Sequence, residues 1–597
     1  MADSGQPVAR PGVSDAAAEP TPEQATQRSS ERGAERGAER GLGGALRAVI
    51  GMTLLSRFAG LARDVMVGRI FGDTATNSAF AAAFQIPNVF RRLFGEGALS
   101  AAFIPAYTRA LREDGAEARR LASLTAAAVA AATSLLTALI SSVLLALLFL
   151  LPADAERDLS LKLILVMLPF MPLICVAAVL AGMLQCFGKF GPASSGPLVL
   201  NGFIVVVAGY SLWSGALAGE ATAYLLGVAT VLSGITQCLW FARLLRGHTT
   251  WHFAHSELRM VGPRAKEMYG KFVPVAIGLG TLQLNTLLDT AIAMYPIWVG
   301  PVIFGLAYPL DSDSNGILAQ SSRLYQFPLG VFGIAVATAI FPLLSRQAAQ
   351  RAQFVGTLRR GVRLSLFIGL PATAGLLLVR HDLVSVLFGR VGESQAGFSP
   401  EGVARAATVV GAFSIGVWAY SLNHVLTRSL YAIGDTVTPM RISLWIMGLN
   451  IAANFGLIWM FRESGLALAT SLAACVQVMV LAVVVSRRLR EKGWSSHDGV
   501  YGSEMFAAIL KLMFVTAVMA ACVGAFLWFV PQPVRWSTRL ARLVGATVIG
   551  AGSYLALAKA MRLPELGWML SRERAGEAQP TDPAAAGAAI DESQNTA

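Results

Sequence analysis

The chain has 597 residues, of which 55% are hydrophobic and only 14% are charged, and its formal net charge is +12 at pH 7. Soluble globular domains carry about 25% charged residues, so this composition excludes an ordinary soluble protein. The positive charge does not indicate nucleic-acid binding, because membrane proteins gather Lys and Arg in their cytoplasmic loops. The composition predicts an all-α polytopic membrane protein.

Fourteen apolar segments are long enough to cross a membrane as helices. They cover residues 45–70, 77–106, 121–151, 158–185, 195–216, 221–243, 271–296, 316–345, 361–380, 403–432, 440–461, 465–487, 505–530 and 538–560. The ends of the chain, residues 1–42 and 562–597, are polar and are expected to be disordered cytoplasmic tails. The first of them has no apolar signal-peptide region.

The charges of the loops predict an orientation. Arg and Lys cluster after the second, sixth, eighth and twelfth spans, whereas the loops after odd-numbered spans are short or acidic, as in residues 152–158. Because positive loops stay in the cytoplasm, both termini are expected to be cytoplasmic.

Two motif pairs indicate an internal repeat. Gln85-Ile86-Pro87 matches Gln326-Phe327-Pro328, and Phe187-Gly188-Lys189 matches Ile433-Gly434-Asp435, both at an offset of about 240 residues. The repeat predicts two pseudo-symmetric six-helix lobes related by an axis along the membrane normal, plus two extra helices. The expected boundaries are 43–246 for the N-terminal lobe, 247–270 for a cytoplasmic linker, 271–490 for the C-terminal lobe and 491–561 for the extra pair.

The stretch Ser56–Pro105 is apolar but unusually rich in charge. It carries Arg57, Arg63, Asp64, Arg69, Arg91, Arg92 and Glu96. An Arg at mid-membrane costs about 2.5 to 3.5 kcal/mol on insertion scales, so several of them indicate a polar cavity lined by cations. Two alternatives stay open: an internal salt bridge of Arg57 or Arg63 with Asp64, and an interfacial anchor at Arg92.

The same stretch resembles the MurJ/MviN family of bacterial lipid II flippases, within the multidrug/oligosaccharidyl-lipid/polysaccharide exporter superfamily. The motifs that carry the resemblance are Ser56-Arg57, Arg63-Asp64, Ile86-Pro87-Asn88, Arg91-Arg92-Leu93, Glu96-Gly97-Ala98, Phe327-Pro328-Leu329-Gly330 and Gly434-Asp435-Thr436. The resemblance extends from about Leu46 to Lys559. Ser78, Ser322 and Gln326 stand where family members often have acidic residues, and the segment Asp311–Gly316 is an unusual insertion.

The resemblance implies a substrate with a diphosphate headgroup, which Arg suits because it is always charged and forks onto phosphate oxygens. Arg57, Arg63, Arg91 and Arg323 are the expected headgroup contacts. Asp64, Arg92 and Glu96 are expected to gate these arginines or to make secondary contacts. The resemblance also implies that spans 13 and 14 form a groove for the lipid tail; peripheral packing is the alternative.

A second group of polar residues lies in the C-terminal lobe: Asp289, Asn450, Asn454 and Thr470. Oxygen ligands near one carboxylate suit a hard monovalent cation, and the resemblance points to sodium. The alternative is a set of hydrogen bonds between helices. Either sodium or the membrane potential is therefore a candidate driving force.

The sequence predicts no enzyme, since neither a nucleophile–base arrangement nor a Walker A motif is found. No cofactor or metal centre is expected, and the five cysteines and the group His248, His252 and His255 are not interpreted as ligands. The expected function is a lipid II flippase of the bacterial inner membrane that works by alternating access. Its expected partners are lipid II, an undecaprenyl-diphosphate-linked disaccharide-peptide, membrane lipids and the cell-wall synthesis machinery, without nucleic acid. The alternatives are export of another polyprenyl-linked glycan or a drug, a membrane-bound enzyme of envelope synthesis, and a non-transporting scaffold.

Overall fold

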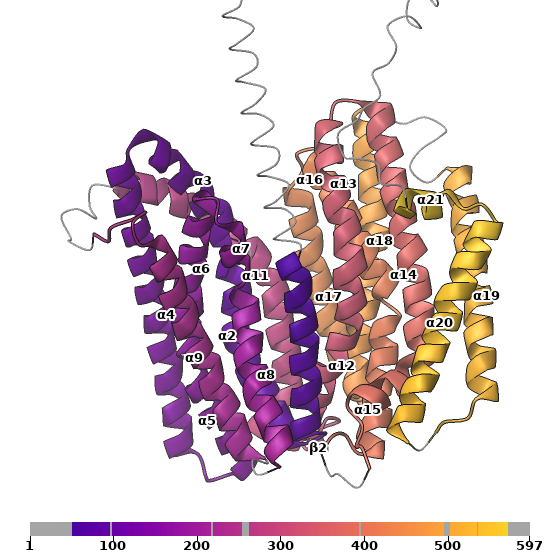
Figure 1. Ribbon diagram of the computed structural model, residues 1–597, viewed down its shortest axis with the longest axis horizontal. Helices are drawn as coiled ribbons and strands as arrows, with labels where there is room; N and C mark the ends of the chain where they lie inside the picture. Colours follow the sequence, from indigo (N-terminus) through magenta and orange to yellow (C-terminus); the bar gives the residue numbers. More distant parts are fainter. Residues whose placement is uncertain are drawn as a thin grey trace, which may run out of the picture.

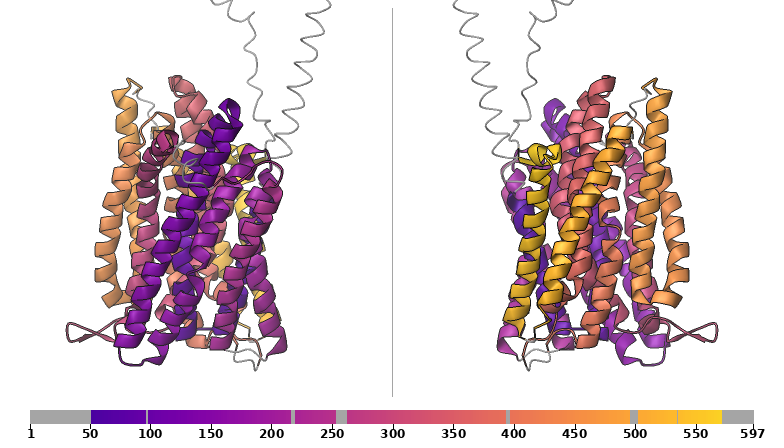
Figure 2. Two further views of the ribbon diagram at one scale, coloured as in Figure 1. Left: turned by 90° about the vertical axis from the view of Figure 1, so that its left-hand side faces the viewer. Right: turned by 90° about the vertical axis from the view of Figure 1, so that its right-hand side faces the viewer.

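A computed structural model describes residues 51–95, 98–215, 219–252, 262–392, 396–494, 502–533 and 535–570. The tail 1–42, residues 571–597 and Glu96 lie outside these ranges. Within them the chain is almost entirely helical, as predicted, and the long helices run side by side through the bundle (Figures 1 and 2).

The helices that precede the middle of the chain are residues 51–71, α2 (Ala75–Gly95), α3 (Ala98–Glu113), α4 (Gly115–Leu150), α5 (Ala155–Met167), α6 (Phe170–Cys186), α7 (Phe190–Ser194), α8 (Gly196–Ser214) and α9 (Glu220–Leu245). The later elements are α11 (Gly262–Trp298), β1 (Val302–Ile303), β2 (Leu306–Ala307), α12 (Ser314–Pro328), η1 (Leu329–Gly333), α13 (Ile334–Arg346), α14 (Arg351–Leu387), α15 (Pro400–Ser414), α16 (Val417–Ala432), α17 (Val437–Phe461), α18 (Glu463–Glu491), α19 (Ser503–Phe529), α20 (Trp536–Ala560) and α21 (Pro564–Leu570).

Ten helical segments of the described chain are long and apolar enough to cross a membrane. They are α4, α5 with α6, α8, α9, α14, α15 with α16, α17, α18, α19 and α20. The other four predicted spans are helical too, in residues 51–71, α2 with α3, α11, and α12 with α13, but these helices are more polar. The protein is therefore a multi-pass membrane protein, and the count of fourteen spans stays a prediction.

The eighth predicted span is interrupted in its middle. Pro328 lacks a backbone N–H, so it cannot donate to the preceding turn, and the chain passes through the π-helical turn η1 before α13 continues. This turn places Gly330 at a point where the two halves of the molecule approach each other.

The two largest hydrophobic clusters of the described residues lie one on each side of the bundle in Figure 1, and a third cluster joins residues of α11, α12, α14, α15, α17 and α18. The first is built mainly from α2 to α9, and the second from α13 to α21. α11 differs from the predicted division, because it packs on α2, α3 and α5 as well as on α12 and α17, and its residues Ala265 and Met268 belong to the first cluster. The predicted lobe boundaries themselves stay predictions.

Candidate functional site

A cavity of about 770 Å³ lies between the two halves. Its lining includes all four arginines predicted as headgroup contacts. Arg57 and Arg63 come from the helix 51–71, Arg91 from α2 and Arg323 from α12. Arg92 lines the same cavity. Arg57 and Arg323, which are 266 positions apart in the sequence, thus meet around one space.

Asp64 connects arginines from both halves. Nε and Nη2 of Arg63 donate to Oδ1 of Asp64 at 2.9 and 2.7 Å, and Nε of Arg323 lies 3.7 Å from Oδ2. Since one carboxylate is shared by two guanidinium groups, the trio keeps a net positive charge. The predicted Arg63–Asp64 salt bridge and the predicted cavity lining therefore both hold.

Neighbouring polar and aromatic groups fix the orientation of these side chains. Nη1 of Arg63 donates to Oδ1 of Asn201 in α8 at 2.8 Å, and its guanidinium lies 5.0 Å from the centre of the Phe84 ring. Nε of Arg91 donates to Oδ1 of Asn88 at 2.8 Å. These contacts hold the guanidinium groups in place ahead of a ligand.

Arg57 reaches the second half directly. Its guanidinium lies against Gly330 of η1, so closely that a Cβ at this position would overlap with it. A larger residue at this position would therefore force the guanidinium of Arg57 to move.

A smaller cavity of about 180 Å³ adjoins the first, because Arg63, Phe84, Arg92, Arg323 and Gln326 line both. Asp289 and Thr470, two of the predicted cation ligands, line this smaller space together with Asp64. The arginine group and the predicted cation site are thus neighbours.

The predicted cation residues form one hydrogen-bonded chain across α11, α17 and α18. Nδ2 of Asn454 donates to Oδ1 of Asp289 at 2.6 Å, and it lies 3.3 Å from Oδ1 of Asn450. Nδ2 of Asn450 in turn donates to Oγ1 of Thr470 at 3.4 Å. These residues therefore form hydrogen bonds between helices, which is the alternative to a cation site.

Two oxygens beside Asp289 are buried without a hydrogen-bond donor in the part of the chain that the structure describes. They are Oδ1 of Asn454 and Oδ1 of Asn285, whose amide nitrogens donate to Asp289. Buried acceptors are normally paired, so this group has capacity for a further partner, and its oxygen chemistry suits a hard cation.

The end of the bundle drawn at the bottom of Figure 1 is closed by contacts between the halves. The backbone N–H of Ser399 donates to Oδ1 of Asp73 at 2.9 Å, and Nε of Arg69 donates to the carbonyl of Leu387 at 2.8 Å. Ser78, where the family often has an acidic residue, accepts from the N–H of Gly316 at 2.8 Å through its hydroxyl. The unusual insertion Asp311–Gly316 thus takes part in this closure.

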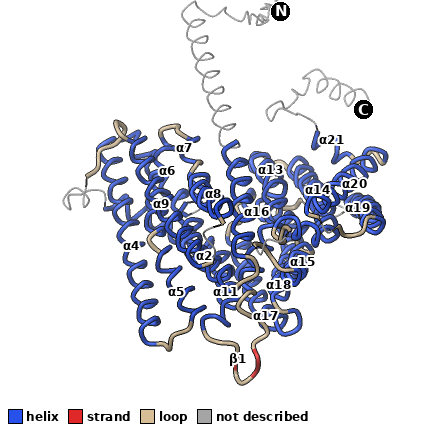
Figure 3. The backbone as a smooth tube through the Cα atoms, turned by 60° about the horizontal axis from the view of Figure 1, so that its bottom comes forward, coloured by secondary structure: helices blue, strands red, loops and turns tan. Residues whose placement is uncertain are grey.

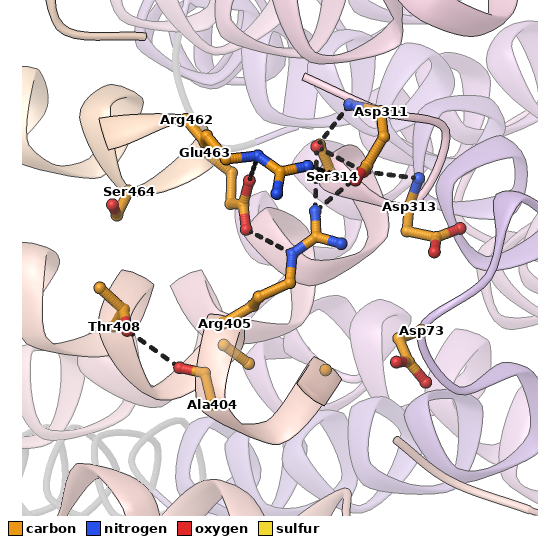
Figure 4. A network of polar contacts seen from close by, with 12 residues as sticks. Asp73, Asp311, Asp313, Ser314, Ala404, Arg405, Thr408, Arg462, Glu463 and Ser464 are labelled. Carbon is orange, nitrogen blue, oxygen red and sulfur yellow. Dashed lines mark hydrogen bonds and ion pairs between the residues drawn. The ribbon is translucent and has the colours of Figure 1, made fainter. Parts of the chain in front are cut away.

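A network of ion pairs lies beside these contacts (Figure 4). Asp311 accepts from Nη2 of Arg405 at 2.8 Å and from Nη2 of Arg462 at 2.5 Å, and Nε of Arg405 donates to Oε1 of Glu463 at 2.7 Å. Burial raises the pKa of Asp311, but the bonds and charges of Arg405, with the charge of Arg462, lower it by more, so the pKa lies below its ordinary value. Burial and then the charge of Asp311 raise the pKa of Asp313 to about 6.

Some polar residues of the site were not among the predicted ones. Asn201 and Asn88 orient arginines, and His424 and Gln283 line the larger cavity. Asn201 stands alone in the apolar run 196–214, and that isolation is a signal that could have singled it out.

The last two predicted spans, α19 and α20, pack on each other and on α14. A buried ion pair of Arg542 with Asp382, at 2.5 Å, joins α20 to α14. The proposed role of this pair of helices as a lipid-tail groove stays a prediction.

Comparison with known proteins agrees with this architecture. The family model described as "Lipid II flippase MurJ" matches residues 67–543. The probable lipid II flippase MurJ of Vibrio cholerae serotype O1 is 31% identical over 540 residues, covering 85% of this chain and 94% of the relative. The Thermotoga maritima protein of the same description is 26% identical over 525 residues, covering 87% of this chain and 97% of the relative.

Solved structures show the same fold. The structure titled "Lipid II flippase MurJ, inward closed conformation" superimposes with a TM-score of 0.67 at 21% identity, over 86% of this chain and 98% of that one. An inward-facing multidrug resistance MATE family transporter of the MOP superfamily gives 0.58 at 13% identity, over 74% and 98%. The family expected from the motifs is thereby confirmed: the chain belongs to the lipid II flippase MurJ family.

Proposed function

We propose that this protein moves lipid II from the inner to the outer leaflet of the bacterial cytoplasmic membrane by alternating access. The observation that carries the proposal is the meeting of four arginines from both halves around one cavity, whose far end is closed. A scaffold would have no use for this costly arrangement of cations within a membrane.

The chemistry of the cavity fits a diphosphate. Arg63 and Arg323 share Asp64, so a doubly charged headgroup can compete with one carboxylate for two guanidinium groups. Because Arg63 belongs to the first half and Arg323 to the second, one bound diphosphate draws the halves together. In this proposal Asp64 releases the arginines when substrate arrives, which is a gating role. Arg92, and Glu96 outside the described residues, are the proposed secondary contacts.

The orientation follows from the loop charges. The closed end carries the loops after odd-numbered spans, which are poor in Lys and Arg, so it faces outward and both termini are cytoplasmic in this proposal. The cavity reaches Thr53 and Ser56 near the beginning of the first described helix, and in this proposal its opening faces the cytoplasm.

Sodium is the proposed coupling ion, with the membrane potential as the alternative driving force. Asp289 would supply the charge, and the oxygens of Asn450, Asn454 and Thr470 would complete the ligand set. Turning the amide of Asn454 would bring its donor-free Oδ1 toward Asp289. In the proposal, the lipid tail lies along α19 and α20, and the enzymes of cell-wall synthesis supply and consume the substrate.

The decisive measurement is the exposure of lipid II on the outer leaflet of cells depleted of their own flippase and expressing this chain. An added enzyme that cleaves only exposed lipid II gives the signal. We expect wild type to restore exposure, Arg63→Ala to restore none, and the control Arg487→Ala, at a residue whose side chain is 80% exposed, to behave as wild type. Well-expressed wild type that restores nothing would contradict lipid II as cargo.

A second candidate cargo is another polyprenyl-linked glycan. Ser78, Ser322 and Gln326 replace acidic residues that the family often carries, and Gln326 lines both cavities. The same cells, tested for outer-leaflet exposure of other polyprenyl-linked glycans, distinguish this candidate.

A further inference from the structure

The segment that joins α11 to α12 forms a small apolar hairpin at the closed end of the molecule. β1 and β2 pair antiparallel, Val302 with Ala307 and Ile303 with Leu306. No charged residue occurs in the sequence between Asp289 and Asp311. A hairpin in water would be expected to carry a polar face, but both strands here are apolar.

The turn places a large hydrophobic side chain at the outermost point. Phe304 is 98% exposed, and Val299, Val302 and Leu306 are exposed as well. Phe304 and Gly305 have φ angles of 51° and 79°, as a two-residue turn of type I′ requires. Asn or Gly would adopt the first of these angles with less strain, so the phenylalanine at this position is unfavourable for the backbone.

Aromatic contacts hold the hairpin in a defined direction. The rings of Tyr295 and Tyr308 lie 4.4 Å apart, the Tyr308 hydroxyl donates to the carbonyl of Ile292 at 2.9 Å, and the Tyr295 hydroxyl donates to the carbonyl of Val302 at 3.2 Å. The hairpin is therefore a firm extension of α11.

The hairpin extends sideways from the bundle, at the level where the helices end, as Figures 2 and 3 show. It is continuous with the lipid-facing surface of α17, where Phe455, Trp459 and Met460 are exposed. Arg462, the residue after α17, donates to the carbonyl of Pro309 at the base of the hairpin, at 3.2 Å. Tyr and Trp side chains such as Tyr295, Trp298 and Tyr308 are typical of the membrane–water interface.

We propose that this hairpin, residues 299–307, is a membrane-interface anchor that inserts Phe304 into the outer leaflet beside α17. Its apolar surface contacts lipid at the boundary between the headgroups and the acyl chains. The anchor fixes the outer end of α11 in the plane of the membrane while the two halves move. The assignment to the outer leaflet rests on the proposed orientation; insertion into lipid does not depend on the cargo.

Spin labels on the full-length protein in phosphatidylethanolamine and phosphatidylglycerol vesicles test the proposal, with the five native cysteines replaced. Oxygen relaxes labels in lipid, and a water-soluble nickel chelate relaxes labels in water. A nitroxide on Phe304→Cys is expected to be relaxed several-fold more by oxygen than by the chelate, and a label on Leu139→Cys in the lipid-facing part of α4 should show the same preference. A label on Ala153→Cys, in the polar loop at the same end, is expected to show the reverse.

Either of two results would overturn the anchor. A label at residue 304 that follows Ala153→Cys would place the hairpin in water. A label shielded from both reagents would place it against another protein molecule. A second label, on Val302→Cys, tests the role of Phe304. Adding Phe304→Asp is expected to lower the ratio of relaxation by oxygen to relaxation by the nickel chelate at this label several-fold, whereas Phe304→Leu should leave the ratio unchanged. An unchanged ratio in the Asp variant would show that Phe304 does not hold the hairpin in lipid.

Discussion

The cavity and the closed end use charge in opposite ways. At the closed end the acidic and basic groups Asp311, Glu463, Arg405 and Arg462 neutralise one another in close ion pairs. In the cavity the arginines outnumber the carboxylates, and Asp64 alone is shared by Arg63 and Arg323. The first arrangement closes the molecule without a ligand, and in the proposed function the second is completed by an anion.

The ion pairs at the closed end bear on stability, and the excess cations in the cavity bear on transport. An ion pair that is satisfied within the protein adds to the stability of one conformation, whereas an excess cation costs stability until substrate arrives. Substitutions at the two places should therefore have different signatures.

The largest expected effect is that of Arg323→Ala in the cavity. Removal of the only predicted headgroup contact from the second half should abolish lipid II exposure while the protein remains inserted. Arg323→Lys keeps the charge but loses the forked geometry, and we expect at least about a tenfold loss of transport. Normal transport by Arg323→Ala would show that the diphosphate does not bridge the halves.

Arg405→Ala should affect stability first. Glu463 is 4% exposed, and it would keep only the longer contact of 3.9 Å to Arg462. Leaving a buried charge without its close partner costs about 3 kcal/mol, which thermal unfolding in detergent would measure. Arg487→Ala, which breaks an exposed pair with Glu491, should cost at most about 0.5 kcal/mol; equal losses would contradict the distinction between the two pairs.

Sodium should stabilise the wild-type protein through the group around Asp289. At about ten times its dissociation constant, an ion adds about 1.4 kcal/mol to the free energy of unfolding. The thermal shift with sodium over potassium should vanish in Asp289→Asn. It should persist in Asn423→Ala, which removes a different polar contact, between α16 and Gln477 of α18. Persistence of the shift in Asp289→Asn would place the sodium site elsewhere, and the absence of any shift in the wild type would leave the membrane potential as the driving force.

The smallest effect concerns pH at the closed end. The pKa of Asp313 is raised to about 6 by burial and by the charge of Asp311, with further charges nearby on Arg405, Asp73 and Glu156. The charged form is thus disfavoured in the folded protein, and the closed end should gain stability as the pH falls through about 6. Asp313→Asn should flatten the dependence of the unfolding temperature between about pH 4 and pH 6; an unchanged slope would assign it to another group.

The arginines of the cavity could be predicted because charge within apolar helices is rare and expensive. The pair of Arg63 with Asp64, the next residue in the chain, is also expected from the sequence. The contact with Asn201 is not, since Asn201 meets Arg63 only once α8 lies beside the first helix. The hairpin at residues 299–307 escaped prediction because Phe304-Gly305 lacks the Asn-Gly or Asp-Gly pattern typical of such turns. The sequence marks Asp311–Gly316 as unusual, but the contacts of this segment with Ser78, Arg405 and Arg462 join parts far apart in the chain and so could not be predicted.

The position of α11 also bears on how the protein is made. Ala265 and Met268 of this helix complete the first hydrophobic cluster, and the helix covers α3. A nascent chain that has emerged only as far as residue 246 therefore still exposes a face of α3 that nothing yet covers. The first half reaches its final packing only after the ribosome has synthesised the beginning of the second, so the two halves mature in an overlapping order.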